Sequence, residues 1–401
     1  MHVPDAPMTH HGDAQRRTRP RPFSACALRV ALFALGIRVV SAVLAFYANI
    51  AFPLYERQPS IMAGAGSPFW DTFTRFDAGW YYPIARNGYH YVAGGRNNLA
   101  FFPVYPLLMR YVGRLFGPRP FDYIRGGILV SWVAFVVAMI ALGCLARLDL
   151  PRRLANRAVL LTAIFPFAFF YGVVYTESVF LLFTVASFYG FRTRRWMLGG
   201  VCGGLATATR VNGIMMLPAL AWIAWRTAAD RREQLRAVIG LVLVCSGIGL
   251  YSLYVYQLTG DPLEWAASIK RWGYHPGGAP WLALFRLAQA LITRPYAYLA
   301  GERSAPYDAL NGVAAFAFVA AVPFVWRRFG AAYGLFMLAN LWLPLSSGQY
   351  EGMGRYCSVL FPGFIWLASL RSRAIATSLV ALFAMWYALC LALYTTTHPV
   401  F

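Results

Sequence analysis

Long apolar runs separated by short polar turns dominate the sequence from about residue 25 to its end. A helix that crosses a bilayer needs about 20 residues, and several of these runs are shorter, which is typical of helices that end inside a protein-lined cavity. We therefore predict an all-α polytopic membrane protein with about eleven transmembrane helices. The runs lie near Ala27–Ala51, Gly127–Ala146, Ala158–Val174, Ser178–Phe191, Trp196–Thr209, Val211–Trp225, Ala237–Leu258, Ala309–Trp326, Ala331–Leu345, Cys357–Leu370 and Ala374–Thr396.

The composition supports a membrane protein. Of the 401 residues, 59% are hydrophobic and 13% are charged, and a soluble domain of this size cannot bury so much apolar surface. The net charge is +21, from 36 basic and 15 acidic residues. Because the arginines punctuate the apolar runs and do not gather on one face, they favour orientation in a membrane, and we expect no nucleic-acid partner.

The short basic loops predict the topology. If the runs are counted in order, every basic cluster falls on the same side as the arginine-rich N-terminal tail, and the positive-inside rule places that side in the cytoplasm. We expect residues 1–23 to be a disordered cytosolic tail and residues 24–401 to form one multi-span domain. The opposite face then receives two long extracytoplasmic segments, at about 52–125 and about 259–308. The clusters are Arg147–Arg157, Arg192–Arg195, Arg226–Arg236, Arg327-Arg328 and Arg371–Arg373.

Asp77 is the first candidate for chemistry, because it lies among aromatic residues in the first long loop. Transfer of a sugar needs a base for the acceptor hydroxyl, and a carboxylate beside apolar groups suits that task. Arg75, Trp80 and Tyr81 are its neighbours and candidates for substrate binding. The alternative is that Asp77 caps a short helix that begins at the next residue. Asp71 is a rival carboxylate in the same loop.

A second motif of the first long loop, Asn97–Pro106, combines two prolines with aromatic residues. Such a segment predicts a rigid, irregular wall at the membrane surface, with Phe102 and Tyr105 as candidates for substrate binding. An interfacial aromatic anchor is the alternative.

Ionisable residues in short turns of the same face form the next group of candidates. Glu177 lies between two apolar runs, where an ionisable side chain indicates function, although it could also favour a helix start through the helix dipole. Arg210 and Arg355 lie in external turns, against the positive-inside trend, and an arginine can bind a lipid phosphate through two parallel hydrogen bonds. A headgroup anchor is the alternative for each. Asn212, Glu351 and Tyr356 lie beside these arginines.

Several classes of site find no support in the sequence. The six cysteines lie in or beside apolar runs without metal-ligand spacing, so we predict no metal site and no cofactor, although a divalent metal is not excluded. The chain has no P-loop and no dinucleotide fingerprint. Since a soluble nucleotide-sugar domain is also missing, a sugar donor would be lipid-borne. Overlapping GxxxG spacing at Gly199-Gly200 and Gly203-Gly204 predicts close helix packing.

Five short motifs, in order along the chain, resemble bacterial members of the phosphatidylinositol-glycan class V (PIG-V) mannosyltransferase family of the GT-C superfamily. The resemblance covers roughly Trp70 to Pro362. Two departures stand out: Phe76-Asp77-Ala78 replaces a Trp-Asp-Gly-like triplet, and Gly354 replaces a common proline. The motifs are Arg75–Tyr82, Ala100–Pro106, Tyr175–Ser178, Ala206–Gly213 and Gly354–Tyr356.

The resemblance implies a GT-C fold, a polyprenyl-phosphate sugar donor and inversion at the anomeric carbon. It implies that Asp77 is the catalytic base and that Glu177, Arg210 and Arg355 share its cavity. The expected partners are the lipid-linked donor, a lipid or glycan acceptor and membrane lipids, in a bacterial plasma membrane with the site on the extracytoplasmic side. A flippase or exporter is the alternative of another class, and it would predict internal repeats and polar residues along the spans.

Overall fold

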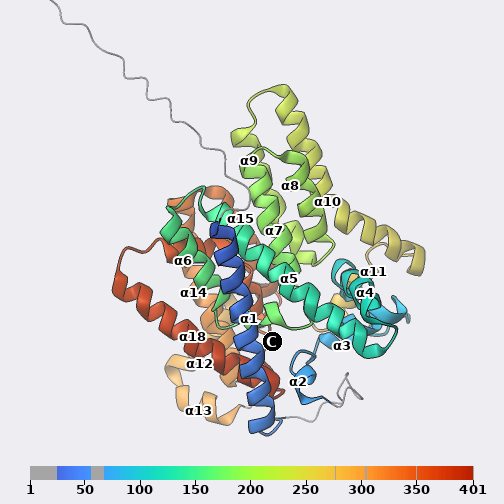
Figure 1. Ribbon diagram of the computed structural model, residues 1–401, viewed down its shortest axis with the longest axis vertical. Helices are drawn as coiled ribbons and strands as arrows, with labels where there is room; N and C mark the ends of the chain where they lie inside the picture. Colours follow the sequence, from blue (N-terminus) through green and yellow to red (C-terminus); the bar gives the residue numbers. More distant parts are fainter. Residues whose placement is uncertain (1–24, 56–66, 276, 303–304, 349, 401) are drawn as a thin grey trace, which may run out of the picture.

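The computed structural model describes residues 25–55, 67–275, 277–302, 305–348 and 350–400, and all regular structure within these ranges is helical (Figure 1). This confirms the all-α prediction, whereas the predicted tail, residues 1–23, lies outside the described residues. The first half comprises α1 (Ala25–Ala51), α2 (Pro68–Asp71), α3 (Ala78–Asn87), η1 (Asn98–Ala100), α4 (Val104–Phe116), α5 (Pro120–Ala146), α6 (Arg152–Ala163), η2 (Ala168–Gly172), α7 (Glu177–Arg192) and α8 (Trp196–Thr207).

The second half of the chain continues in the same manner. Each apolar run predicted as a span contains or overlaps one of the observed helices, and α15 has the predicted bounds. The elements are η3 (Val211–Met216), α9 (Leu217–Thr227), α10 (Arg231–Thr259), α11 (Glu264–Arg271), α12 (Pro280–Thr293), α13 (Pro295–Gly301), α14 (Ala305–Phe329), α15 (Ala331–Leu345), α16 (Met353–Ser358), α17 (Phe361–Ala368) and α18 (Arg373–Thr395).

Five helices in the described residues are long and apolar enough to cross a membrane, namely α1, α5, α10, α14 and α18. The protein is therefore a multi-pass membrane protein by length and composition, while the count of eleven stays a prediction. The other apolar helices are shorter; α8 has 12 residues and α15 has 15.

Short helices end inside the bundle, and the sequence between α6 and α7 shows why. The predicted span Ala158–Val174 is wrong in its second half, because α6 ends at Ala163. Pro166 follows closely, and a proline disfavours helix at the residue before it. The segment from Ile164 to Thr176 then runs without α-helix, and every residue in it is buried. Irregular backbone at such depth is tolerated only where protein covers it.

Glycines let α8 pack closely on both of its neighbours. A Cβ on Gly199 would meet the Phe191 ring of α7 at 2.6 Å, and one on Gly204 would meet the Leu243 carbonyl oxygen of α10 at 2.6 Å. The overlapping GxxxG pattern therefore serves two helix interfaces, which confirms the predicted close packing.

The segment predicted as the first long loop contains α2, α3, η1, α4 and the start of α5, and it lies beside the bundle (Figure 1). Arg110 of α4 donates to the carbonyl oxygens of Ile84 and Ala85 at the end of α3. Asn97 folds the next loop onto itself: its amide nitrogen donates to the Val92 carbonyl oxygen at 3.0 Å, and its side-chain oxygen accepts from the Val92 N–H.

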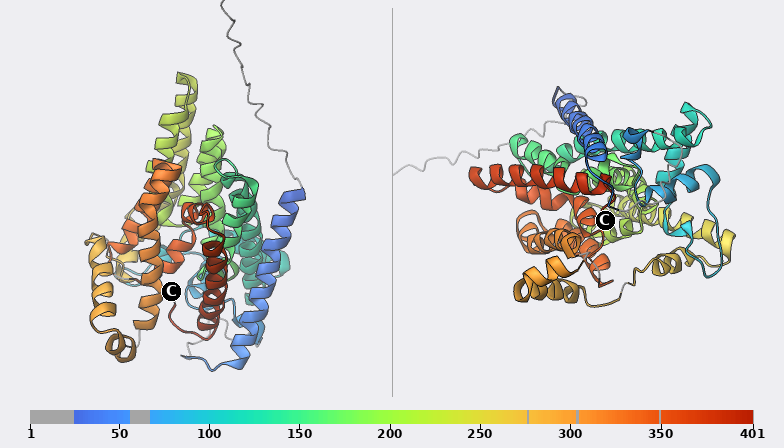
Figure 2. Two further views of the ribbon diagram at one scale, coloured as in Figure 1. Left: turned by 90° about the vertical axis from the view of Figure 1, so that its left-hand side faces the viewer. Right: turned by 90° about the horizontal axis from the view of Figure 1, so that it is seen from below.

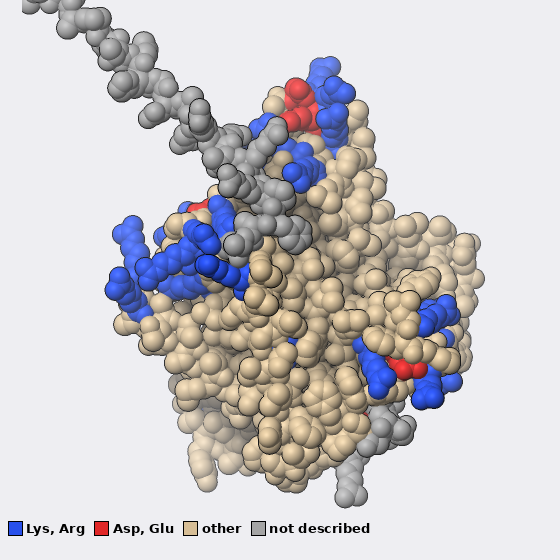
Figure 3. Space-filling model, viewed as in Figure 1, with Lys and Arg blue, Asp and Glu red and all other residues tan. Residues whose placement is uncertain are grey.

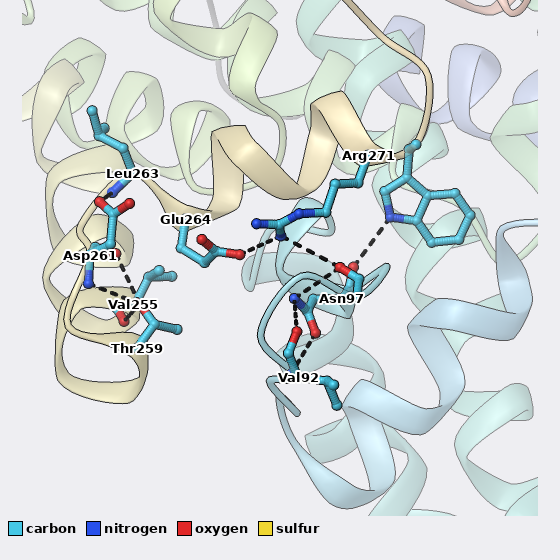
Figure 4. Close-up of polar contacts among 10 residues, drawn as sticks. Val92, Asn97, Val255, Thr259, Asp261, Leu263, Glu264 and Arg271 are labelled. Carbon is cyan, nitrogen blue, oxygen red and sulfur yellow. Dashed lines mark hydrogen bonds and ion pairs between the residues drawn. The ribbon is translucent and has the colours of Figure 1, made fainter.

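Helix α11 covers this loop (Figure 4). Arg271 pairs with Glu264 on its own helix at 2.5 Å and reaches the Gly95 carbonyl oxygen at 3.5 Å. Trp272, directly after the helix, donates from its indole nitrogen to the Asn97 carbonyl oxygen at 3.2 Å. The second long segment thus packs on the first.

Elements from both ends of the chain surround the centre of the bundle. Helices α1 and α18 lie side by side, and α1 and α12 lie at opposite edges of the molecule (Figure 2). Arg38 of α1 is 1% exposed, and it donates to the Ala168 carbonyl oxygen of η2 and to the Tyr387 hydroxyl of α18. These bonds link the irregular segment between α6 and α7 to α1 and, through Arg38, to α18.

Candidate active site

Four charged side chains from distant parts of the chain meet in the protein interior. Arg355 of α16 places Nη1 2.6 Å from Oδ2 of Asp77 and Nε 3.3 Å from Oε1 of Glu177. Arg210, which precedes η3, pairs with the same Oε1 of Glu177. We call Asp77, Glu177, Arg210 and Arg355 the charged cluster. It unites four residues that the sequence singled out separately.

Exposure separates the two carboxylates. Glu177 is fully buried and lies between the two arginines, whereas the Asp77 side chain is 26% exposed. Both arginine side chains are 11% exposed. Asp77 and an edge of each guanidinium are therefore partly exposed, whereas Glu177 is a buried carboxylate between the two arginines. The headgroup-anchor alternative for the two arginines is wrong, because both point into the protein.

The backbone around Asp77 is shaped for this contact. Phe76, just before it, has a φ of 52°; this conformation is energetically costly for any residue other than glycine and is enriched at functional sites. Asp77 occupies the N-cap position of α3, but its side chain makes no capping hydrogen bond. The capping interpretation is therefore wrong. The Asp77 N–H instead donates to the Tyr175 hydroxyl at 3.1 Å.

Aromatic rings enclose the two guanidinium groups. The Arg355 guanidinium carbon lies 5.7 Å from the Phe170 ring centroid and 5.5 Å from that of Tyr175. Arg210 lies 5.1 Å from the Tyr356 ring and 5.8 Å from the Phe180 ring. Cation–π contacts of this kind stabilise a cation and exclude water from it. The predicted Tyr356 thus belongs to the site through Arg210.

Helix α16 carries Arg355, and its position is set by Gly354. A Cβ on Gly354 would lie 2.3 Å from the Phe167 ring, so only glycine allows this approach. The Gly354 N–H donates to the Asn311 side-chain oxygen at 2.8 Å, a bond that proline could not make. The surroundings of residue 354 in this chain therefore suit glycine and would not suit the proline that is common in the family.

Three further polar residues are near the cluster, Asn212 in the sequence and Glu351 and Tyr274 in space. Asn212 of η3 is 5% exposed, and its amide nitrogen has no partner among the described residues. Loss of solvent raises the pKa of Glu351, which precedes α16, while Arg355 opposes that shift. Burial also raises the pKa of Tyr274, with Tyr356, Glu351 and Asp77 acting in the same direction and Arg355 opposing them. Tyr274 was missed by the sequence reasoning, since a tyrosine in a long loop has no distinguishing pattern.

Trp80 and Tyr81 extend the site from α3. Trp80 stacks on Phe101 with a ring separation of 5.8 Å and meets Trp272 edge-on at 4.7 Å. Tyr81 is buried, and this burial raises the pKa of its hydroxyl, with Asp77 acting in the same direction. Together these rings form an aromatic wall at the start of α3, directly after Asp77.

Three candidates lie outside the charged cluster. The Arg75 side chain bonds to Asn49 at 2.7 Å and to the Thr395 carbonyl oxygen at 3.1 Å, so it joins α1 to the end of α18. Phe102 is 2% exposed and packs on Tyr251 in a separate small core. Tyr105 is fully buried, and its hydroxyl bonds to the Gly127 carbonyl oxygen at 3.1 Å. These three side chains support the fold around the site, because each already forms hydrogen bonds or ring contacts with other elements.

No metal cluster is evident in the part of the chain that the structure describes: no three His, Cys, Asp or Glu side chains gather there. The rival carboxylate Asp71 lies in α2, and burial raises its pKa while Arg75 opposes the shift. Asp71 makes no ion pair within the described residues, and one of its oxygens is buried without a hydrogen-bond partner.

Comparison with known proteins identifies the family. The family described as Mannosyltransferase (PIG-V) matches residues 27–258, which is more than half of the chain. This confirms the family that the sequence motifs predicted. No curated protein matches the chain.

Solved structures with a related arrangement are distant. ArnT from Cupriavidus metallidurans, solved with undecaprenyl phosphate, is 11% identical with a TM-score of 0.49, over 94% of this chain and 77% of that chain. The Archaeoglobus fulgidus oligosaccharyltransferase with zinc and sulfate is 14% identical with a TM-score of 0.47, over 91% and 53%. The S. cerevisiae Pmt1–Pmt2 complex, a protein O-mannosyltransferase bound to its sugar donor, is 12% identical with a TM-score of 0.39, over 60% and 34%. The chain spans about half the length of the oligosaccharyltransferase, and values this low assign no substrate or residue role.

Proposed function

Because this chain belongs to the mannosyltransferase (PIG-V) family, we propose that it transfers a sugar from a polyprenyl-phosphate donor to a lipid or glycan acceptor. Mannose is the sugar that the family description favours. We place the reaction on the extracytoplasmic side of a bacterial plasma membrane, where the basic loops orient the long segments around Asp77. The overall arrangement that we propose is GT-C-like.

The observation that carries the proposal is the contact between an accessible carboxylate and a buried guanidinium. Asp77 and Arg355 meet at 2.6 Å, and a second arginine and a second carboxylate lie directly behind them. A base for the acceptor and cations for a phosphate are the two groups that such a transfer needs. The cluster carries two positive and two negative formal charges, which suits a site inside a membrane protein.

The proposed reaction uses the two carboxylates differently. Asp77 accepts the proton of the acceptor hydroxyl as that oxygen bonds to the anomeric carbon. The bond from the anomeric carbon to the phosphate oxygen breaks, and its electron pair leaves with the polyprenyl phosphate. Attack opposite to the leaving group inverts the configuration. Glu177 keeps its contacts with both arginines throughout, because it is buried away from the substrate.

Arg355 couples the two events in this mechanism. When Asp77 takes the proton, its carboxylate becomes neutral and its attraction for Arg355 falls. At the same moment the leaving phosphate gains a negative charge, and a guanidinium binds such an oxyanion through paired hydrogen bonds. Arg355 therefore passes from the carboxylate to the phosphate as the reaction proceeds, with Arg210 on the other side of Glu177.

The experiment is an assay of purified protein with a panel of polyprenyl-phosphate sugars and candidate lipid or glycan acceptors. We expect a product whose mass equals the acceptor plus one hexosyl residue (a hexose less one water), together with free polyprenyl phosphate. A protein that only moved lipid-linked sugars across vesicles, with no new product from any donor, would contradict the proposal and favour a flippase.

A further inference from the structure

A groove at the beginnings of α1 and α6 lies apart from the charged cluster. It has a volume of about 280 Å³. None of its lining residues takes part in the contacts described for the site. The polar lining residues are Arg29, Arg152 and Asn156, and the apolar ones are Val30, Phe33, Val159 and Leu160.

The groove changes from polar to apolar in the same order along both helices. In α1, Arg29 is followed one turn later by Phe33, and in α6, Asn156 is followed one turn later by Leu160. One turn of helix rises about 5.4 Å. The groove therefore has a basic mouth at the helix starts and apolar walls about one turn deeper, as an amphiphile requires.

The groove is positively charged. Its lining contains two arginines and no acidic residue. Arg153 is exposed next to Arg152 and adds to the positive charge, which Figure 3 shows gathered over this end of α6. The α6 N-terminus contributes a further partial positive charge. An anion is thus the complementary occupant of the mouth.

We propose that this groove binds an anionic phospholipid, with its phosphate at Arg29 and Arg152 and the first methylenes of a chain against Phe33 and Leu160. The rest of the acyl chain would follow α1, whose outer face is apolar: Leu32 is 60% exposed and Val39 is 48% exposed. A free phosphate would fill the mouth and leave the walls uncovered. Basic pockets beside membrane helices recognise lipid headgroups by this combination of charge and apolar surface.

The test measures the melting temperature of the purified full-length protein in mixed micelles that contain phosphatidylglycerol or phosphatidylcholine at equal mole fraction. A ligand that binds only the folded state raises the melting temperature. We expect a larger rise with phosphatidylglycerol, and a smaller difference between the lipids in the double variant Arg29→Gln/Arg152→Gln. An arginine near such a surface contributes about fivefold in affinity, so the double variant should need roughly 25-fold more lipid for the same response.

The matched control is Arg231→Gln/Arg232→Gln, which removes two exposed arginines from the start of another membrane-spanning helix, α10. This control should respond like the wild type. Phe33→Ala keeps both groove arginines and should also weaken the response, because the apolar wall is shortened. Native mass spectrometry of retained lipid gives a second measurement for any variant that melts too early to compare.

Three results would overturn the proposal. The first is that the melting temperatures in phosphatidylglycerol and phosphatidylcholine differ by the same amount in the groove variant and in the α10 control. The second is a response to inorganic phosphate as large as that to phosphatidylglycerol, which would indicate an anion site without lipid. The third is a wild-type lipid response of Phe33→Ala, which would show that the groove does not hold the acyl chain of the lipid. None of these measurements depends on glycosyl transfer.

Discussion

At the residue scale, burial distinguishes two carboxylates that share one arginine, and we propose a different task for each. Asp77 is accessible at the edge of the cluster and Glu177 is sealed within it, although both contact Arg355. A proton acceptor must meet substrate, and a counter-charge must not. The two residues should therefore fail in different ways when they are changed.

Glu177→Gln should lower stability as well as activity. The change leaves Arg210 and Arg355 without their buried counter-charge, and breaking a buried ion pair costs about 3–5 kcal/mol. We expect an earlier thermal transition of the detergent-purified protein. Asp77→Asn is the comparison, since Asp77 is partly exposed and its loss leaves Glu177 in place. A wild-type melting temperature for Glu177→Gln would contradict the role of counter-charge.

Arg355→Ala should weaken the use of the donor, because a hydrogen bond to a charged group contributes about 1.5–3 kcal/mol. Arg355→Lys should restore only part of this, since an ammonium group cannot reproduce the paired geometry of a guanidinium. The measurement is the dependence of the transfer rate on donor concentration. Unchanged donor kinetics in both variants would remove Arg355 from the site.

The family resemblance implied one cavity for the four charged residues, but the sequence could not predict which of their side chains pair. Asp77, Glu177, Arg210 and Arg355 stood out because charge is rare among apolar runs. Arg75 was a candidate as a neighbour of Asp77, and Tyr105 as an aromatic residue of the Asn97–Pro106 motif, yet each is engaged by a neighbouring element. Whether a polar side chain faces the site or the scaffold depends on packing between distant segments, which a single sequence does not contain.

At the element scale, interrupted helices place the site inside the bundle. The irregular segment before α7 brings Phe170 and Tyr175 beneath Arg355, and Arg38 holds it from the other side. The proline that ends α6 was visible in the sequence, but the apolar run around it predicted a longer helix. Hydropathy reports burial, and a buried irregular segment is as apolar as a helix.

The position of α16 gives a prediction at this scale. Gly354→Ala would place a Cβ 2.3 Å from the Phe167 ring, so either α16 or that ring must shift, and we expect the shift to disturb the contact between Arg355 and Asp77. Overpacking of this kind costs about 1–3 kcal/mol, and we expect activity to fall together with stability. Gly249→Ala in α10 is the control, because a Cβ there meets nothing within 4 Å. Equal behaviour of the two variants in thermal unfolding and transfer would contradict this account of α16.

At the scale of the whole molecule, the fold class was predictable and the number of spans was not. Composition alone requires a membrane protein, and α1, α5, α10, α14 and α18 are long enough to cross one. The shorter apolar helices, such as α8 and α15, pack against these, and their length does not decide whether they span.

A reporter experiment tests the topology. With a cytoplasmic N-terminus and about eleven spans, a reporter active only outside the cytoplasm should be active after Phe401 and silent after Arg195. The basic turn at Arg192–Arg195 would lie inside by the positive-inside rule. The reverse pattern would contradict the topology and move the charged cluster to the cytoplasmic side.

The most direct test of the account is sugar transfer by Asp77→Asn, measured in membranes at matched expression with monodispersity after detergent extraction as the folding control. Asparagine keeps the size of aspartate but cannot accept the proton of the acceptor, and general-base catalysis contributes about 10²–10⁴-fold. Asp71→Asn, which changes the other carboxylate of the same region, should keep its activity. The account predicts a folded Asp77→Asn protein whose transfer rate falls by at least about a hundredfold, and near-normal transfer by that variant would contradict it.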